Sequence, residues 1–326
     1  MLNEHEDEHH LLQRAKYIAS HLNLHDRLIP HVAEHLHHLA RGRSPIIWIQ
    51  GQNCTGCSVT LMDSEHFDPT DLYHGKLSLR YQPDLMAAAG YQAIDDLKET
   101  EAEEVGRYIL VVEGAIPTGE GERFCTFGLA NTTKQLMGNT VPEDRTIYAW
   151  LEELTPGAAA VIAVGNCASF GGIPSENAGI TGATSVPEVI AEMDSDKPVI
   201  NVAGCPPHPD WLMGTLVDVM LWVTGEKEAP ELNEHGCLEI FYHQLIHDGC
   251  ERKASFEKKR FLLDWNDAEE PENKCLIRLG CKGMKTHGDC PSRRWSENVN
   301  WCVGANAPCQ GCTEPGFLKR LPRSPK

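Results

Sequence analysis

Cysteine and histidine are the metal-binding residues that stand out in this 326-residue chain, which has 13 Cys and 16 His. One set combines Cys54 and Cys57, separated by Thr-Gly, with Cys167 and Cys205, each of which follows a glycine by one or two positions. A C-x-x-C pair places two thiolates on one tight loop, as tetrahedral metals require. Neighbouring glycines let the backbone approach a bulky group. This set therefore predicts a four-cysteine metal centre.

The last third of the chain carries two further sets of ligand-type residues. One set has a histidine and three cysteines: His247, Cys250, Cys275 and Cys281. The other has four cysteines: Cys290, Cys302, Cys309 and Cys312. Spacing alone leaves two zinc sites (Cys₃His and Cys₄) or two iron–sulfur clusters open. The first set suits a cubane better than a zinc ribbon, and no catalytic base is obvious, so three such sites favour an electron relay.

The elements that must position these ligands are predicted from short apolar runs. Five runs are predicted as buried strands: Ile46–Ile49, Leu77–Tyr81, Tyr108–Val112, Ala160–Val164 and Val199–Val202. Helical stretches lie between several of them, around 84–104 and 181–193, so the pattern predicts an α/β domain with a doubly wound parallel sheet. Such sheets bind ligands beyond the carboxyl ends of their strands. The cysteines of the first set follow strands and are expected to converge there.

Composition divides the chain into three predicted segments. Residues 1–43 hold nine of the histidines and are expected to form a helical N-terminal extension. Its role stays open between docking a partner, binding a metal through its histidines and capping the protein as a solvated helical pair. Residues 44–215 form the predicted α/β domain. Residues 216–326 have few apolar runs and eight cysteines, so bound metal would supply much of their folding free energy.

Charge and hydropathy exclude two classes of partner. Acidic residues outnumber basic ones 47 to 29, for a net charge of −18, and this balance repels a phosphate backbone, so no nucleic-acid partner is expected. No apolar run reaches 18 residues, so no membrane span is expected in this chain. The first ten residues are acidic and lack an apolar h-region. We therefore expect a cytoplasmic protein, with a periplasmic location through processing or co-export as the alternative.

The motifs around these residues resemble the small subunits of nickel–iron hydrogenases. The resemblance runs in order over residues 45–318 and rests on eight motifs: IWIQGQNCTGCSVTL at 47–61, VEGAIP at 112–117, AVGNCASFGG at 163–172, AGCPPHPDW at 203–211, IHDGC at 246–250, LGCKG at 279–283, NWCV at 300–303 and CQGCTEP at 309–315. It implies a flavodoxin-like domain followed by an irregular, cysteine-rich iron–sulfur domain. The implied function is an electron relay for a hydrogenase, an oxidoreductase acting on H₂, whose nickel–iron centre lies only in a separate large subunit.

The resemblance also implies a ligand set for each cluster. The proximal [4Fe–4S] cluster would be held by Cys54, Cys57, Cys167 and Cys205. The distal [4Fe–4S] cluster would be held by His247, Cys250, Cys275 and Cys281. The medial cluster would be held by Cys290, Cys309 and Cys312, and by Cys302 where the family usually has proline. A fourth thiolate predicts a medial [4Fe–4S] cluster, as in the nickel–iron–selenium subgroup; without Cys302 as ligand it would be [3Fe–4S].

Two cysteines and one glutamate lie outside the three implied ligand sets. Cys125 and Cys237 are left over and are expected to be small buried hydrophobic residues. Glu113 follows the third strand and is expected near the proximal cluster, either as a structural carboxylate or as part of a proton relay. The chain itself is expected to contain no catalytic residue.

The implied partners are a hydrogenase large subunit, in an obligate heterodimer or a dimer of heterodimers, and an external electron acceptor or donor near His247. Two rival interpretations remain open. A subunit of an energy-converting respiratory complex would resemble only the proximal-cluster half. A zinc-stabilised scaffold without redox function would use the same cysteines for a different metal.

Overall fold

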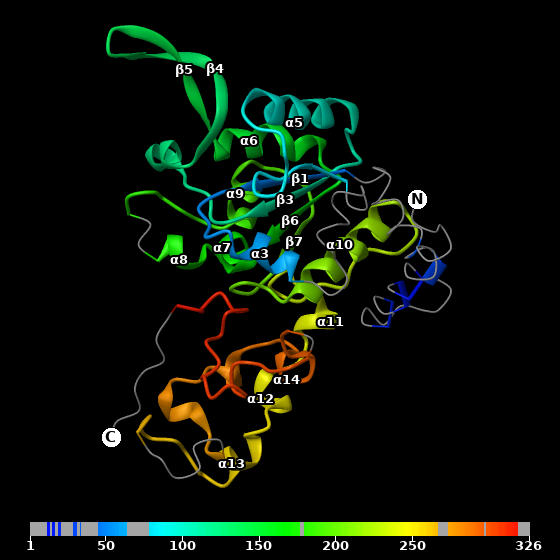
Figure 1. Cartoon of the computed structure of the whole chain (residues 1–326), viewed down its shortest axis with the longest axis vertical. Coiled ribbons are helices and arrows are strands. Elements are labelled where there is room, and N and C mark those ends of the chain that lie inside the picture. Colours follow the sequence, from blue (N-terminus) through cyan, green and yellow to red (C-terminus); the bar gives the residue numbers. More distant parts are fainter. Residues whose placement is uncertain are drawn as a thin grey trace.

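The computed structural model describes residues 12–13, 15–16, 19–20, 29–30, 33, 45–63, 78–176, 179–266, 273–296 and 298–318. Most of the predicted N-terminal extension lies outside these residues. Those of it that are described are helical, and Ala15 is fully buried in the core. Figure 1 shows a sheet domain with helices on both faces and, beside it, a smaller domain that contains only short helical turns.

A five-stranded parallel sheet organises the larger domain. Its strands are β1 (Ile46–Gln50), β2 (Leu79–Tyr81), β3 (Ile109–Glu113), β6 (Ala160–Val164) and β7 (Val199–Val202). They lie in the order β2-β1-β3-β6-β7, with every pair parallel. This is the 2-1-3-4-5 order of flavodoxin-like sheets once the separate β4–β5 ribbon is set aside. The predicted α/β fold and all five predicted strands are confirmed, each boundary within two residues.

Alternating side chains of the strands build two separate cores. Trp48, Val111 and Ile162 pack on one face, with α10 and α3, whereas Ile49 and Leu110 pack on the other, with α5, α6 and α9. These strands are buried on both faces, which explains their continuous apolar sequences. The helices of this domain are α3 (Gly56–Met62), α5 (Tyr91–Glu103), α6 (Ile147–Leu154), α7 (Gly165–Phe170), α8 (Gly172–Ser175), α9 (Val186–Glu192) and α10 (Pro209–Val223).

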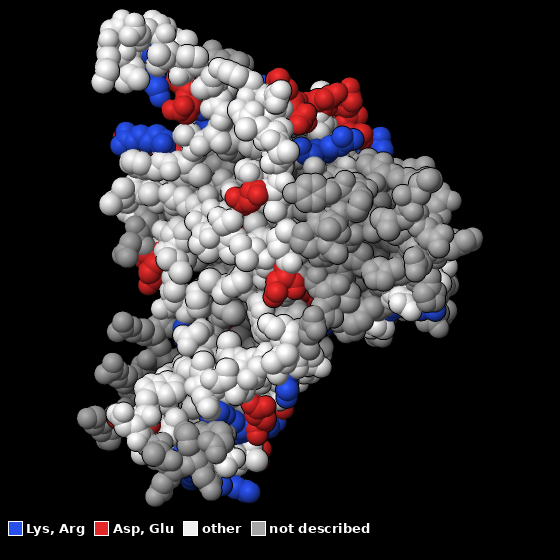
Figure 2. Space-filling view, viewed as in Figure 1, with Lys and Arg blue, Asp and Glu red and all other residues white. Residues whose placement is uncertain are grey.

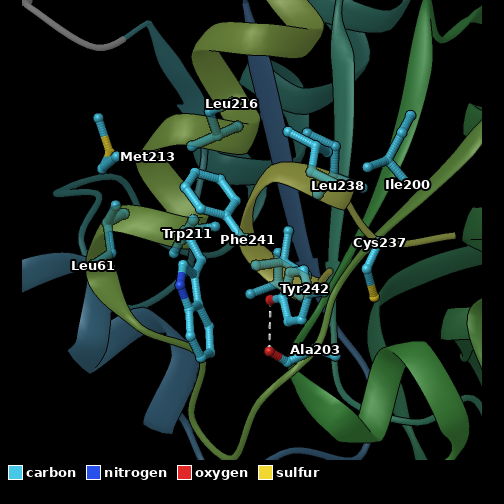
Figure 3. Packing of buried hydrophobic residues seen from close by; sticks show 14 of the residues in the cluster. Leu61, Ile200, Ala203, Trp211, Met213, Leu216, Cys237, Leu238, Phe241 and Tyr242 are labelled. Atoms are coloured by element: carbon cyan, nitrogen blue, oxygen red, sulfur yellow. Dashed lines mark hydrogen bonds between the residues drawn. The ribbon is translucent and has the colours of Figure 1, made fainter. Parts of the chain in front are cut away.

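Helix α10 connects the core of the sheet domain to the C-terminal domain. It begins earlier than the apolar run near Leu216 indicates, because Pro209 fits the first helical position and the His208 ring accepts the N–H of Asp210 at 3.1 Å. Figure 3 shows Trp211 of this helix beside Phe241 and Tyr242 of α11 (Glu239–Tyr242). The Tyr242 hydroxyl donates to the backbone oxygen of Ala203 at 2.8 Å, which fixes α11 against the loop after β7.

An antiparallel ribbon of two strands, β4 (Thr126–Leu136) and β5 (Asn139–Thr146), projects from the sheet domain in Figure 1. No sequence pattern predicted it. Its turn residues Met137 and Gly138 both have positive φ, 49° and 81°, as type I′ hairpin turns require. The base of the ribbon is anchored where the Phe127 ring stacks on Trp150, with 5.1 Å between ring centroids.

The C-terminal domain is irregular, as the sequence predicts. Its helical segments after α11 are α12 (Ile246–Gly249), α13 (Lys253–Glu257), η5 (Leu276–Leu279), η6 (Gly283–Lys285) and α14 (Cys290–Arg293). The sheet domain also contains two short 3₁₀ helices, η2 (Gly119–Phe124) and η3 (Thr155–Gly157). On the face in Figure 2, charged side chains gather over α5 and over the C-terminal domain, and the area between them is largely uncharged.

Candidate metal centres

The four cysteines of the first set converge at the carboxyl edge of the sheet. Cys57 lies in the first turn of α3, after β1, Cys167 lies in α7, after β6, and Cys205 lies in the loop after β7. Burial raises the pKa of the Cys57 thiol well above its ordinary value, and the charges of Glu113, Cys167, Cys54 and Cys205 raise it further. The predicted convergence of the four cysteines is therefore observed. Two of them, Cys54 and Cys205, are exposed.

Three glycines make room for the sulfur atoms of this set. A Cβ on Gly165 would lie 2.4 Å from the Cys57 sulfur, and one on Gly172 would lie 2.8 Å from the Cys167 sulfur. A Cβ on Gly56 would lie 3.2 Å from the Cys54 sulfur. The first two glycines also have positive φ, +85° and +50°, which other residues rarely adopt. The backbone is thus shaped to admit thiols and a group bound to them.

Glu113 lies beside Cys57 and is almost fully buried, with 1% of its surface exposed. Its carboxylate accepts hydrogen bonds from the Cys57 backbone N–H at 3.1 Å, the Ser58 hydroxyl at 2.6 Å and the Trp48 indole N–H at 3.2 Å. In all three contacts the carboxylate acts as the acceptor. Gln82 continues the network by donating to the Ser58 hydroxyl at 2.8 Å. The contacts fix the orientation of the α3 N-terminus, as a structural carboxylate would.

The four residues of the second set line one pocket in the C-terminal domain. His247 belongs to α12 and Cys250 follows it, whereas Cys275 and Cys281 lie at the two ends of η5. The His247 ring is partly exposed and contacts the Phe256 ring edge-on, with 4.8 Å between centroids. The backbone N–H of Arg252 donates to the Cys250 sulfur at 3.4 Å. The second set therefore lines a pocket that is already formed in this chain, and its histidine is partly exposed at the surface.

The four cysteines of the third set also gather together. Burial raises the pKa of the Cys290 thiol well above its ordinary value, and the charges of Cys312, Asp289, Cys309 and Cys302 raise it further. Cys302, the residue that replaces proline, is thus within electrostatic reach of Cys290. It is exposed, whereas Cys290 and Cys309 are buried.

The three sets follow one another in space. The side-chain amide of Asn166, next to Cys167 of the first set, donates to the backbone oxygen of Cys312, in the third set, at 2.9 Å. The backbone N–H of Lys282, next to Cys281 of the second set, donates to the backbone oxygen of Cys309, in the third set, at 2.8 Å. The third set therefore lies between the other two, although its residues come last in the sequence.

The residue types of these sets are compatible with iron–sulfur clusters. Thiolates are soft ligands that bind iron–sulfur clusters as well as zinc, and glycines leave room beside the sulfurs of the first set. In the described ranges, no group of three or more His, Cys, Asp or Glu side chains is placed to hold a single metal ion.

Some residues that organise these sites were missed from the sequence. Asn166 is 2% exposed and its side-chain amide donates to the backbone oxygens of Cys312 at 2.9 Å and Glu314 at 3.1 Å. Its position directly before Cys167 was the only available signal. Arg293 pairs with Asp210 across the domain junction and with Asp289 of its own domain, and no sequence pattern predicts the pairing across the junction.

The two remaining cysteines lie apart from these sets. Cys237 is 1% exposed and packs in the core, as expected for a small hydrophobic residue. Cys125 is only partly buried and packs against the second core cluster. Burial raises the pKa of the Cys125 thiol to about 11, so it stays protonated at neutral pH.

Two family profiles match consecutive parts of the chain. Residues 54–219 match the profile described as NADH ubiquinone oxidoreductase, 20 Kd subunit. Residues 242–323 match the profile for the C-terminal part of the small subunit in NiFe/NiFeSe hydrogenases. The first match agrees with the resemblance of the proximal half to respiratory-complex subunits, and the second match is specific to hydrogenases.

Full-length relatives agree with the second profile. The chain is 37% identical over 277 residues to the periplasmic [NiFeSe] hydrogenase small subunit of Desulfomicrobium baculatum, covering 84% of each chain. It is 35% identical over 309 residues to the hydrogenase-1 small chain of Escherichia coli K12, covering 95% of this chain and 76% of the relative.

Solved structures give the same result. A reduced, active [NiFeSe] hydrogenase from Desulfomicrobium baculatum matches with a TM-score of 0.76 and 37% identity, over 85% of this chain and 96% of that one. The actinobacterial-type NiFe hydrogenase of Ralstonia eutropha H16 matches with a TM-score of 0.73 and 28% identity, over 86% and 81% of the two chains.

These findings exclude both rival interpretations. A role in a respiratory complex is excluded by the hydrogenase-specific C-terminal match, and a zinc scaffold without redox function is excluded by the family. Among the described residues, no helix has the length and apolar character to cross a membrane. A small subunit also implies a large hydrogenase subunit as its partner. The chain belongs to the NiFe/NiFeSe hydrogenase small subunits and is the iron–sulfur electron-transfer subunit of such an enzyme.

Proposed function

We propose that twelve side chains hold three [4Fe–4S] clusters in a relay between the large subunit's nickel–iron centre and an external acceptor or donor. The proximal ligands are Cys54, Cys57, Cys167 and Cys205, the medial ligands Cys290, Cys302, Cys309 and Cys312, and the distal ligands His247, Cys250, Cys275 and Cys281. The spatial order of the three sets carries this proposal, since the medial set is hydrogen-bonded both to the residue before Cys167 and to the residue after Cys281. Clusters bound there would supply one-electron redox chemistry.

The chain's own contribution is to hold the ligands and to surround the sulfurs with hydrogen-bond donors. The backbone N–H of Arg252 donates to the Cys250 sulfur at 3.4 Å. The backbone groups of Ile173 and Gly311 act to lower the pKa values of the Cys167 and Cys309 thiols, against the larger effect of burial. Hydrogen bonds to ligand sulfurs stabilise the more negative, reduced state and so tune the reduction potential.

A four-iron medial cluster is supported by the position of Cys302. Its charge acts on the thiols of both Cys290 and Cys312, so it stands with the other three medial cysteines rather than apart from them. A [3Fe–4S] cluster would leave this thiol without a role. Four thiolates in place of three lower the potential through added negative charge, which would allow electrons to run in either direction with little uphill step.

The exposed side of the proximal set supports a heterodimer with the large subunit. Cys54 and Cys205 are exposed in this chain, although a low-potential cluster functions best away from solvent. Ile173, next to the proximal edge, is 60% exposed. A large apolar interface there would resemble a divided core, as in obligate complexes. The external partner would dock at the opposite end, near the partly exposed His247.

Cellular location and higher assembly stay predictions. A cytoplasmic complex stays a prediction, whereas the Desulfomicrobium baculatum relative is named periplasmic. Cell fractionation followed by immunodetection distinguishes the two locations. Mass photometry of the native complex distinguishes a heterodimer from a dimer of heterodimers.

A pair of cysteine substitutions, made in the co-purified complex of both subunits, tests the relay. Cys57→Ala removes a proposed ligand, and H₂-driven reduction of a dye is expected to fall at least tenfold, together with loss of iron. Cys125→Ala is the matched control, since Cys125 lies apart from the three sets. Wild-type dye reduction by a Cys57→Ala complex that lacks the proximal iron would refute the relay.

A further inference from the structure

Buried charged groups join the sheet domain to the C-terminal domain between two proposed ligands. Asp210 lies at the start of α10, five residues after Cys205, and Arg293 lies at the end of α14, three residues after Cys290. The Arg293 guanidinium donates to Asp210 at 2.8 Å, and to Asp289 through two nitrogens at 2.9 Å and 2.7 Å. The three side chains are only 10–14% exposed. The guanidinium therefore bridges the two domains.

Aromatic neighbours complete this junction. The Trp211 indole donates to the other carboxylate oxygen of Asp289 at 2.8 Å. His208 contacts the backbone oxygen of Arg294 through Nε2 at 2.6 Å. Because its Nδ1 accepts the backbone N–H of Asp210, the Nε2 must carry the proton and donate. His208, Asp210 and Trp211 of the sheet domain thus each have a partner within four residues of Cys290 (compare Trp211 in Figure 3).

A second tie lies on the other side of the same junction. The backbone N–H of Asn166 donates to the oxygen of Gly204 at 2.6 Å, and so joins the loops that carry Cys167 and Cys205. Its buried side-chain amide then donates to the backbone of Cys312 at 2.9 Å.

We propose that Arg293 and Asn166 are positioning residues that hold the proximal and medial ligand sets at a fixed separation. Domains of one chain move relative to each other unless their interface prevents it, and electron transfer slows exponentially as the separation of two centres grows. A buried ion pair adds little net stability but specifies one geometry, because neither charge tolerates an alternative partner. This inference rests on the proposed ligand sets.

The test uses four variants of the co-purified complex. Arg293→Leu removes the bridging charge, and Arg293→Lys keeps the charge but not the paired geometry. Asn166→Ala removes the second tie with a smaller change. Arg294→Leu is the matched control, since that neighbouring side chain is 40% exposed and has only a 4.0 Å contact with Glu251.

The readout is the splitting of the EPR signals of the fully reduced complex, which arises from coupling between neighbouring clusters. Dipolar coupling falls with the third power of the separation, so it reports geometry directly. We expect Arg294→Leu to keep the wild-type splitting. In Arg293→Leu and Asn166→Ala, the splitting that arises from coupling between the proximal and medial clusters should be lost or broadened. Arg293→Lys should restore it partly.

The outcomes separate this inference from the proposed function. Unchanged splitting in Arg293→Leu and Asn166→Ala, with full iron content in both, would overturn the positioning role and leave the relay intact. If Arg293→Leu loses iron, the EPR splitting of Asn166→Ala tests the positioning role in its place. A wild-type complex without three reducible clusters would instead overturn the proposed function itself.

Discussion

The replacement Gly165→Ala should dismantle the proximal site without touching any ligand. Gly165 lies at φ +85°, and an added Cβ would come within 2.4 Å of the Cys57 sulfur. No side chain tolerates that distance, and the nearest atom that can yield is the sulfur itself. The Cys57 thiol must therefore rotate or shift away from the position in which it converges with the other three cysteines.

The magnitude follows from two separate costs. A left-handed conformation costs an alanine about 1–2 kcal/mol, and forcing extra volume into packed surroundings costs about 1–3 kcal/mol. The expected loss of folding stability is therefore about 2–5 kcal/mol. Gly225→Ala is the matched control, because Gly225 has φ +79° but nothing within 4 Å of its added Cβ. It should cost only the backbone share and leave the metal content unchanged.

Chemical denaturation and iron analysis of the purified complexes measure the two effects together. We expect Gly165→Ala to lose about four iron atoms per chain, the content of one cube, and to unfold at lower denaturant concentration than Gly225→Ala. Full iron with a wild-type proximal EPR signal in Gly165→Ala would refute the reasoning, because it would show that Cys57 need not stand where this structure places it.

Three further predictions concern the medial cluster, a buried carboxylate and a buried histidine. Cys302→Pro should convert the medial cluster to a three-iron centre in a folded protein, and an oxidised sample without a three-iron EPR signal would count against Cys302 as ligand. Glu113→Gln should destabilise the chain by about 1–3 kcal/mol, since an amide cannot accept all three buried donors; thermal unfolding beside the exposed control Glu99→Gln measures this, and equal midpoints would contradict it. Burial lowers the pKa of His208, and the nearby Asp210 carboxylate opposes this only in part. The folded state therefore favours the neutral His208 ring. The contribution of this ring to folding stability is complete above the pKa of about 6.5 that histidine has in the unfolded chain. It is lost as the pH falls from there toward the lower pKa of His208 in the folded protein. Denaturation midpoints at about pH 7.5 and about pH 5.5 should differ less in His208→Asn than in the wild type, and identical pH dependence would exclude this contribution.

The sheet was predictable because its strands are short, apolar on both faces and separated by helical stretches. That pattern has few alternatives in a soluble protein. The β4–β5 ribbon was missed because its strands are polar on both faces, and periodicity marks a strand only where one face is buried. Its one local signal was Met137–Gly138, a turn pair that also occurs in loops.

The grouping of the cysteines was predictable for a different reason. Thiolates, a histidine and nearby glycines form dense local motifs, and the order of strands places the first set on one edge of the sheet. The order of the three sets in space was not readable from spacing, since it depends on contacts such as that of Asn166 with Cys312, which are far apart in the sequence. Asn166, Arg293 and Asp210 were missed because hydrogen bonds between distant polar residues leave no periodic pattern. Only the folded chain brings these partners together.

The most direct test of the central claim is the metal content of this chain in its native complex. Three four-iron clusters predict about twelve iron atoms per chain, in addition to the iron and nickel of the large subunit, with no zinc. About eleven would reduce the medial cluster to three irons and contradict Cys302 as a ligand. About eight iron atoms, or zinc in place of iron, would contradict the three-cluster relay.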